Sequence, residues 1–182
     1  MKIIIHLSCW SLIWTIMLVY QVQDRYMSVG EHKVYSSIIG AAHDAAVVSR
    51  KGVEEGRVIF DEELGTRQFR ASLAANLRLY ADDLSPQPDS MFGVPLKIVG
   101  LFFLGDDKAP QGVDGFPVYP WTFTATAEYR GGQVPIRETI YGPSVVGVIE
   151  FTHNVNVPGV GKPVTYKKAT YRYYDRALYL SN

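Results

Sequence analysis

The fold depends first on the stretch IIIHLSCWSLIWTIMLVY, which runs from Ile3 to Tyr20 and contains no Asp, Glu, Lys or Arg. As a helix rising about 1.5 Å per residue, it would be roughly 27 Å long. A bilayer core is about 30 Å thick, and about 17 residues are the fewest that cross it as a helix. The stretch therefore predicts a transmembrane helix, and we assign residues 1–22 to a membrane anchor.

Two other interpretations of this stretch compete with the anchor. A cleaved signal peptide needs a small-residue cleavage site, whereas Tyr20 is followed by QVQDRY with no Ala-x-Ala pattern. A buried helix of a soluble protein is disfavoured by the uniform apolarity at the N-terminus. We expect an uncleaved signal anchor in the cell membrane, with Lys2 on the cytoplasmic side and residues 23–182 outside the cytoplasm.

Composition excludes several classes of function. The 182 residues carry 18 Lys and Arg against 18 Asp and Glu, so no net positive charge favours nucleic acid. The single cysteine, Cys9, allows neither an intramolecular disulfide nor a cysteine-based metal site. We interpret Cys9 as a small apolar residue of the anchor helix.

Helical periodicity continues beyond the anchor. Residues 21–51 contain no proline and show two apolar stripes that are out of phase on either side of Gly30. We expect one long helix ending at Gly52, with the small-residue run 40–46 allowing a neighbouring backbone to come close. Adjacent helix positions do not face each other, so we expect the side chains of His43 and Asp44 to diverge. A second amphipathic helix should begin after Asp61 and end within 80–83.

From Val94 onward the pattern changes to that of strands. Thr122, Thr124 and Thr126 alternate with apolar residues, and Arg130-Gly131-Gly132-Gln133 is typical of a hairpin turn. Expected strands cover 96–104, 121–129, 134–141, 145–157 and 164–174, and 158–163 should form a turn. Helices followed by adjacent strands predict an α+β fold with an antiparallel sheet, the helices within 23–83 and the sheet within 94–176.

No catalytic or cofactor motif appears. The four histidines lack metal-ligand spacing, and the acidic clusters are explained by helix capping and solvation. Asp106, Asp107 and Asp114 share a loop without the regular pattern of a calcium site. We therefore expect no metal, no cofactor and no enzymatic activity.

Tyrosines gather near the C-terminus, up to Tyr179. They favour cross-strand packing. The alternative is an aromatic face that binds a glycan or peptide, formed by Tyr166, Tyr171 and Tyr173.

An apolar N-terminal helix that continues into an amphipathic helix and then an antiparallel sheet resembles the plan of type IV pilins and pseudopilins. The small-residue run 40–46 resembles pilin-like membrane proteins of tight-adherence clusters. The resemblance implies a structural subunit of a surface filament or of a secretion or pilus assembly, whose partners are membrane lipid and its own copies or other pilin-like subunits. A basic leader with a Gly-type cleavage point and a Glu five residues into the mature helix are not evident in this sequence, which therefore departs from the prepilin pattern.

Under this hypothesis subunits associate by helix packing, which favours close backbone approach at small residues. The residues assigned to packing are Ile3, Trp10, Trp14, Gly40, Ala41, Ala42, Ala45 and Ala46. The alternative function is a membrane-tethered binding domain that uses the aromatic face.

Overall fold

The computed structural model describes residues 2–154 and 161–174 of the chain. The predicted strand residues 155–157, the first half of the predicted turn (residues 158–160), the sheet residues 175–176 and Tyr179 lie outside the described residues. The helices are α1 (Lys2–Ala45), α2 (Arg50–Glu55) and α3 (Glu62–Leu77), and the strands are β1 (Lys97–Leu104), β2 (Trp121–Tyr129), β3 (Gly132–Ile140), β4 (Ser144–Thr152) and β5 (Val164–Arg172). Helices thus precede an antiparallel sheet, which confirms the α+β class.

Helix α1 runs through Gly30 without interruption but stops at Ala45, before the predicted end at Gly52. The residues after Ala45 are needed in an extended conformation, because Ser49 N–H donates to the Ile59 carbonyl and Asp61 N–H donates to the Val47 carbonyl. Gly52 instead lies buried inside α2. The predicted helix end was wrong because this tertiary pairing replaces the last turn of the helix.

The second half of α1 and helix α3 form one wall of the core. Gly65 of α3 approaches α1 closely: a Cβ built on it would lie 2.6 Å from the Ala45 carbonyl oxygen and 2.6 Å from Phe103 Cε1. Such spacing is available only to glycine. The fully buried apolar side chains that the two helices contribute are Val34, Ile38, Ala41, Ala42, Ala45, Phe69, Leu73 and Leu77.

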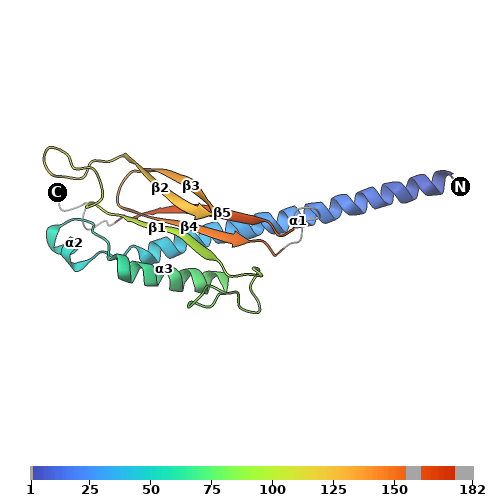
Figure 1. The fold of residues 1–182 in the computed structure, drawn as a ribbon, viewed down its shortest axis with the longest axis horizontal. Helices are drawn as coiled ribbons and strands as arrows, with labels where there is room; N and C mark the ends of the chain where they lie inside the picture. Colours follow the sequence, from blue (N-terminus) through green and yellow to red (C-terminus); the bar gives the residue numbers. More distant parts are fainter. Residues whose placement is uncertain (1, 155–160, 175–182) are drawn as a thin grey trace.

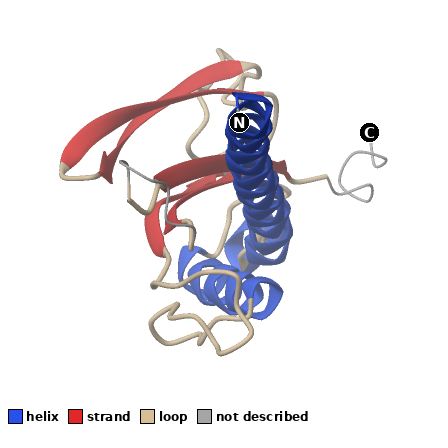
Figure 2. Ribbon diagram, turned by 90° about the vertical axis from the view of Figure 1, so that its right-hand side faces the viewer, coloured by secondary structure: helices blue, strands red, loops and turns tan. Residues whose placement is uncertain are grey.

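Strand β4 is the centre of a three-stranded antiparallel sheet in the order β1-β4-β5. Its odd-numbered residues, such as Ile149, join the helical core, whereas Val146 and Val148 pack on the opposite face against the β2–β3 hairpin. The strand is therefore buried on both faces, and the domain has three layers. The helices lie on one side of the sheet and the hairpin on the other (Figure 2).

The β2–β3 hairpin is closed by a two-residue turn, with φ of 51° at Arg130 and 75° at Gly131. These values match a type I′ turn, whose twist suits a hairpin. Ala127 and Ile136 are buried against the central sheet, whereas the threonines of β2 are exposed on the other face. The alternation predicted for β2 is therefore observed.

The domain has two distinct ends along its long axis. At the proximal end, defined by Glu31, α1 enters the domain; at the distal end α1 terminates near Ala45 (Figure 1). Strand β5 begins near the proximal end, where Lys167 pairs with Glu31, and rises to the distal end, where the ring of Tyr171 meets that of His43.

Candidate membrane anchor and domain surfaces

The first half of α1 projects away from the domain (Figure 1) and is exposed along its whole length. Every residue from Ile3 to Tyr20 is exposed, including Trp10 at 60% and Trp14 at 62%. By length and composition this is a helix that could cross a membrane. None of its apolar window is buried in the structure, so it is not a core helix of this domain.

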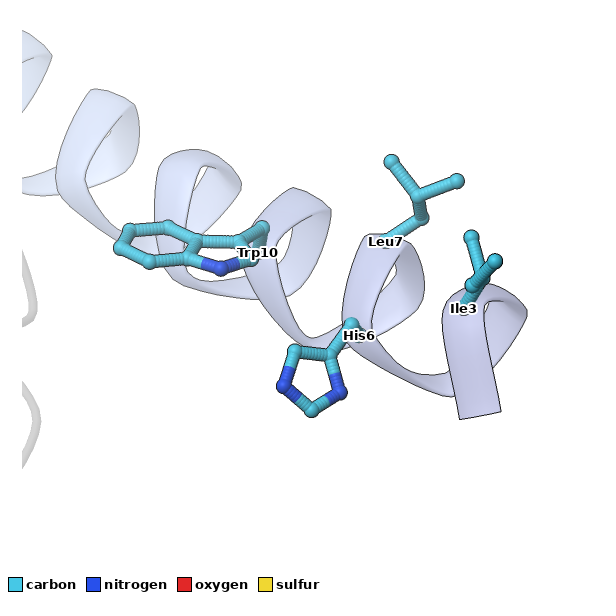
Figure 3. A pocket seen from close by; sticks show the side chains of 4 residues that line it. All are labelled: Ile3, His6, Leu7 and Trp10. Atoms are coloured by element: carbon cyan, nitrogen blue, oxygen red, sulfur yellow. The ribbon is translucent and has the colours of Figure 1, made fainter. Parts of the chain in front are cut away.

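The outermost turns of α1 carry Ile3, His6, Leu7 and Trp10, with a shallow hollow between these side chains (Figure 3). All four side chains come from one helix, which cannot enclose a ligand by itself. Further along, the hydroxyl of Thr15 donates to the Ser11 carbonyl over 2.9 Å, so this polar group is satisfied within the helix. Such a surface suits surrounding lipid better than a small molecule.

The small-residue run 40–46 does not face outward as a packing surface for other subunits. Ala41, Ala42 and Ala45 are fully buried in the domain's own core, and Ala46 is 9% exposed. Gly40 lies beside α3, where a Cβ would be 3.5 Å from Asn76 Nδ2. The close backbone approach predicted for this run is therefore to α3 of the same chain, and we correct its assignment to assembly between subunits.

The tyrosines proposed as a binding face do not share one face. Tyr166 lies on the hairpin side of β5 and packs against Tyr129, with ring centroids 5.0 Å apart. Tyr171 and Tyr173 lie on the helix side and join the main core cluster. The structure thus separates Tyr166 from Tyr171 and Tyr173, because successive side chains of a strand alternate between faces.

A buried histidine that the sequence analysis did not single out lies at the proximal end. The His153 side chain is 3% exposed, with its Nε2 3.2 Å from Thr165 Oγ1 and 3.8 Å from Glu31 Oε1. Lys167 Nζ pairs with Glu31 Oε2 at 2.6 Å. Burial lowers the pKa of His153, opposed by the charge of Glu31. The cluster joins α1 to the sheet at the point where the helix leaves the domain.

His43 and Asp44 meet rather than diverge: His43 Nδ1 lies 3.0 Å from Asp44 Oδ1. The contact is at the protein surface, and Asp44 also accepts a hydrogen bond from the Ser72 hydroxyl at 2.6 Å. The Ser72 hydrogen bond, followed by that of His43, lowers the pKa of Asp44. Because Ser72 lies on α3, the hydrogen bond between Ser72 and Asp44 depends on the packing of α3 against α1, which the local sequence does not reveal.

The acidic loop does not gather its carboxylates around one point. Asp106 accepts hydrogen bonds from the Val58 amide at 2.7 Å and from the Tyr119 hydroxyl at 3.0 Å, so it serves the loop's own structure. The Asp107 carboxylate instead faces Lys108, with Oδ2 of Asp107 3.9 Å from Nζ of Lys108. Among the described residues, no group of three or more His, Cys, Asp or Glu side chains is placed to hold a metal ion.

No family model, no curated protein and no solved structure matches this chain.

Proposed function

We propose that the protein is a single-pass membrane-anchored structural subunit of a surface filament or of a secretion or pilus assembly. The observation that supports this most is the helix from Ile3 to Tyr20, which is apolar, uncharged and exposed around its whole circumference. In water this surface would be strongly unfavourable, whereas lipid or neighbouring helices would cover it.

The arrangement of α1 supports a structural role. One continuous helix forms the proposed anchor and then a wall of the domain core, so the domain is held on the anchor without a flexible linker. Any force or position imposed on the membrane helix is transmitted to the sheet. We place the domain outside the cytoplasm, with the helix packing against lipid and against pilin-like partners through its first half only.

A substitution in the anchor tests the proposal. Leu12→Arg introduces a charge near the centre of the span, at a cost of about 2.5–3.5 kcal/mol for insertion. We expect this variant to leave the membrane fraction, or to be extracted by alkaline carbonate, whereas the native chain remains. Val29→Arg is the matched control, because Val29 is also an exposed apolar residue of α1 but lies beyond the span.

Two results would contradict the anchor. One is a native full-length chain that is soluble without detergent. The other is equal membrane retention of Leu12→Arg and the native chain. The orientation is tested separately with a membrane-impermeant maleimide on Thr126→Cys in a Cys9→Ser background, which should label intact cells if the domain is outside.

A further inference from the structure

The outer edge of β2 in the two-stranded sheet and the outer edge of β5 in the three-stranded sheet both present backbone groups that their own sheets do not use. In a two-residue hairpin the residues flanking the turn, Tyr129 and Gly132, form a hydrogen-bonded pair, and such pairs alternate along the strands. The odd-numbered residues of β2 therefore bond to β3. The even-numbered residues Thr122, Thr124, Thr126 and Glu128 direct their backbone N–H and C=O groups to the outer edge of β2.

The same reasoning applies to β5. His153 N–H donates to the Pro163 carbonyl and Tyr173 N–H to the Pro143 carbonyl, so odd-numbered residues form the hydrogen-bonded pairs with β4. The even-numbered residues of β5 face its outer edge, and the Val164 carbonyl there accepts only a hydrogen bond from the Tyr129 hydroxyl at 2.7 Å among the described residues. The other backbone groups on this edge belong to Tyr166, Lys168, Thr170 and Arg172.

The outer edge of β3, in contrast, is blocked. Pro135 occupies an outward-facing position and has no N–H, and the Arg137 carbonyl accepts from Lys168 Nζ at 3.0 Å. Proline and lysine are the usual means of protecting an edge. Strand β2 contains neither residue, and on β5 Lys167 and Lys168 are held by Glu31 and Glu138 on opposite faces of the strand.

The outer edges of β2 and β5 lie on opposite flanks of the domain, and the two strands run in opposite directions. Strand β2 lies over β1, because Glu128 Oε2 of β2 is 3.9 Å from Lys97 Nζ of β1. Strand β3 lies over β5, because Glu138 of β3 forms an ion pair with Lys168 of β5. Strand β5 rises from the proximal to the distal end, whereas β2 descends to Tyr129, which contacts the start of β5. Figure 1 shows both directions along the domain.

We propose that β2 of one copy adds as an antiparallel strand to the outer edge of β5 of a neighbouring copy in the same membrane. This inference rests on the proposed anchor, because anchored copies share one orientation. In co-oriented copies β2 and β5 are antiparallel without turning either molecule over. An antiparallel β2–β2 pair would require opposite anchors, and a parallel pair is slightly less stable per residue.

The membrane also limits the register. Within one copy Thr124 pairs with Arg137, and the Arg137 carbonyl accepts from Lys168 Nζ, so the heights of Thr124 and Lys168 above the anchor differ by no more than the reach of a lysine side chain. Within that range, we align Thr124 with Lys168 in neighbours at equal height. The same register aligns Thr126 with Tyr166 and Thr122 with Thr170.

This alignment meets two independent requirements of strand pairing. All aligned residues are even-numbered, so the outward N–H and C=O groups of both edges meet, which a shift of one residue would prevent. The aligned side chains include a Thr–Thr pair and a threonine beside an aromatic ring, both favourable across strands. Since the two edges lie on different flanks, each copy can bind one neighbour on either side, giving an open row or a ring.

Cross-linking in native membranes tests the pairing. Two differently tagged full-length chains, both carrying Cys9→Ser, are co-expressed, one with Thr126→Cys and the other with Tyr166→Cys, and treated with a short bis-maleimide. We expect a cross-linked dimer that contains both tags. The mismatched combination of Thr122→Cys with Tyr166→Cys is the control, because it is displaced by four residues, or about 13 Å, along the strand.

A second variant separates edge pairing from folding. Thr124→Pro removes an N–H that β3 does not use, whereas the matched Thr124→Ala keeps it. With Thr124→Pro we expect the cross-link to fall to the level of the mismatched combination, and with Thr124→Ala we expect it to persist. Thermal unfolding of both variants shows whether the domain stays folded. If proline unfolds it, Thr126→Pro, at the next outward position, replaces it against Thr126→Ala, with the cross-link read from Thr122→Cys and Thr170→Cys.

Equal cross-linking of the matched and mismatched combinations in membranes that retain the protein would overturn the strand pairing and leave the anchor standing. Equal cross-linking of folded proline and alanine variants would also overturn the strand pairing and leave the anchor standing. Loss of the native chain from the membrane fraction would instead overturn the anchor itself.

Discussion

At the scale of single residues, we expect His153 to make the attachment of α1 sensitive to pH. Its ring is buried between α1 and the sheet, facing Glu31 of α1 and Lys167 of β5, and burial lowers its pKa below the ordinary value of about 6.5. As the pH falls below about 6.5, the unfolded chain binds a proton that the folded chain does not. The free energy of unfolding should therefore decrease as the pH falls through this range, until the folded ring also takes up its proton.

Denaturant unfolding of the full-length chain in detergent, at about pH 7.5 and about pH 5.5, measures this effect. His153→Asn should remove much of the difference between the two pH values, whereas His32→Asn, at an exposed position, should leave it unchanged. Asp44 does not interfere, because its lowered pKa confines its contribution to pH values near and below 3.8. An unchanged pH dependence in His153→Asn would contradict the assignment.

At the scale of elements, the contact between α1 and α3 depends on the absence of a side chain at Gly65. Gly65→Ala would place a Cβ 2.6 Å from the Ala45 carbonyl oxygen, which belongs to backbone that cannot easily move. We expect a loss of about 1–3 kcal/mol in the free energy of unfolding, as for other overpacked cores. The measurement is denaturant unfolding of the full-length chain.

Gly40→Ala is the matched control, because Gly40 also lies within a helix at the same interface. Its added Cβ would meet only Asn76 Nδ2 at 3.5 Å, an ordinary contact. Alanine favours a helix over glycine by about 0.8–1 kcal/mol, so this variant should be neutral or more stable. Equal destabilisation by both substitutions would show that Gly65 is not required for close packing.

Elements with a strong local pattern were predictable from the sequence. The exposed apolar helix at residues 3–20, strand β2 with its alternating threonines, and the cap of α3 by Asp61, whose side chain accepts from the Leu64 amide, all follow local rules. The end of α1 at Ala45 was not predictable, because it depends on pairing with Ile59 and Asp61. The separation of Tyr166 from Tyr171 was already implied by their odd spacing along one strand.

Contacts between distant segments account for the other differences. His153 gives no sequence signal as a buried residue, because its neighbours Glu31 and Lys167 come from the beginning of the chain and from the next strand. The small-residue run has the same composition whether it packs on a neighbouring subunit or on α3. Only the packing of Ala41, Ala42 and Ala45 in the core distinguishes the two.

At the scale of the whole molecule, α1 has an exposed apolar part and a part in the domain core, and truncation should distinguish the roles that we propose for them. Residues 3–22 are exposed throughout, so they contribute little to the core of the domain. A chain of residues 23–182 keeps Val34, Ile38 and Ala45 in place. We expect it to be soluble without detergent and to unfold cooperatively, with a midpoint near that of the full-length chain.

Removing residues 1–45 should give the opposite result, because it deletes one wall of the core as well as the anchor. Deleting a single buried Leu or Ile side chain typically costs about 2–5 kcal/mol, and this truncation removes several apolar side chains at once from a domain whose total stability is about 5–15 kcal/mol. Circular dichroism and thermal unfolding of the two truncated chains provide the comparison. If residues 46–182 fold cooperatively on their own, α1 is an attachment to the domain rather than part of it. If residues 23–182 stay in the membrane fraction, a surface other than the apolar helix holds the protein there.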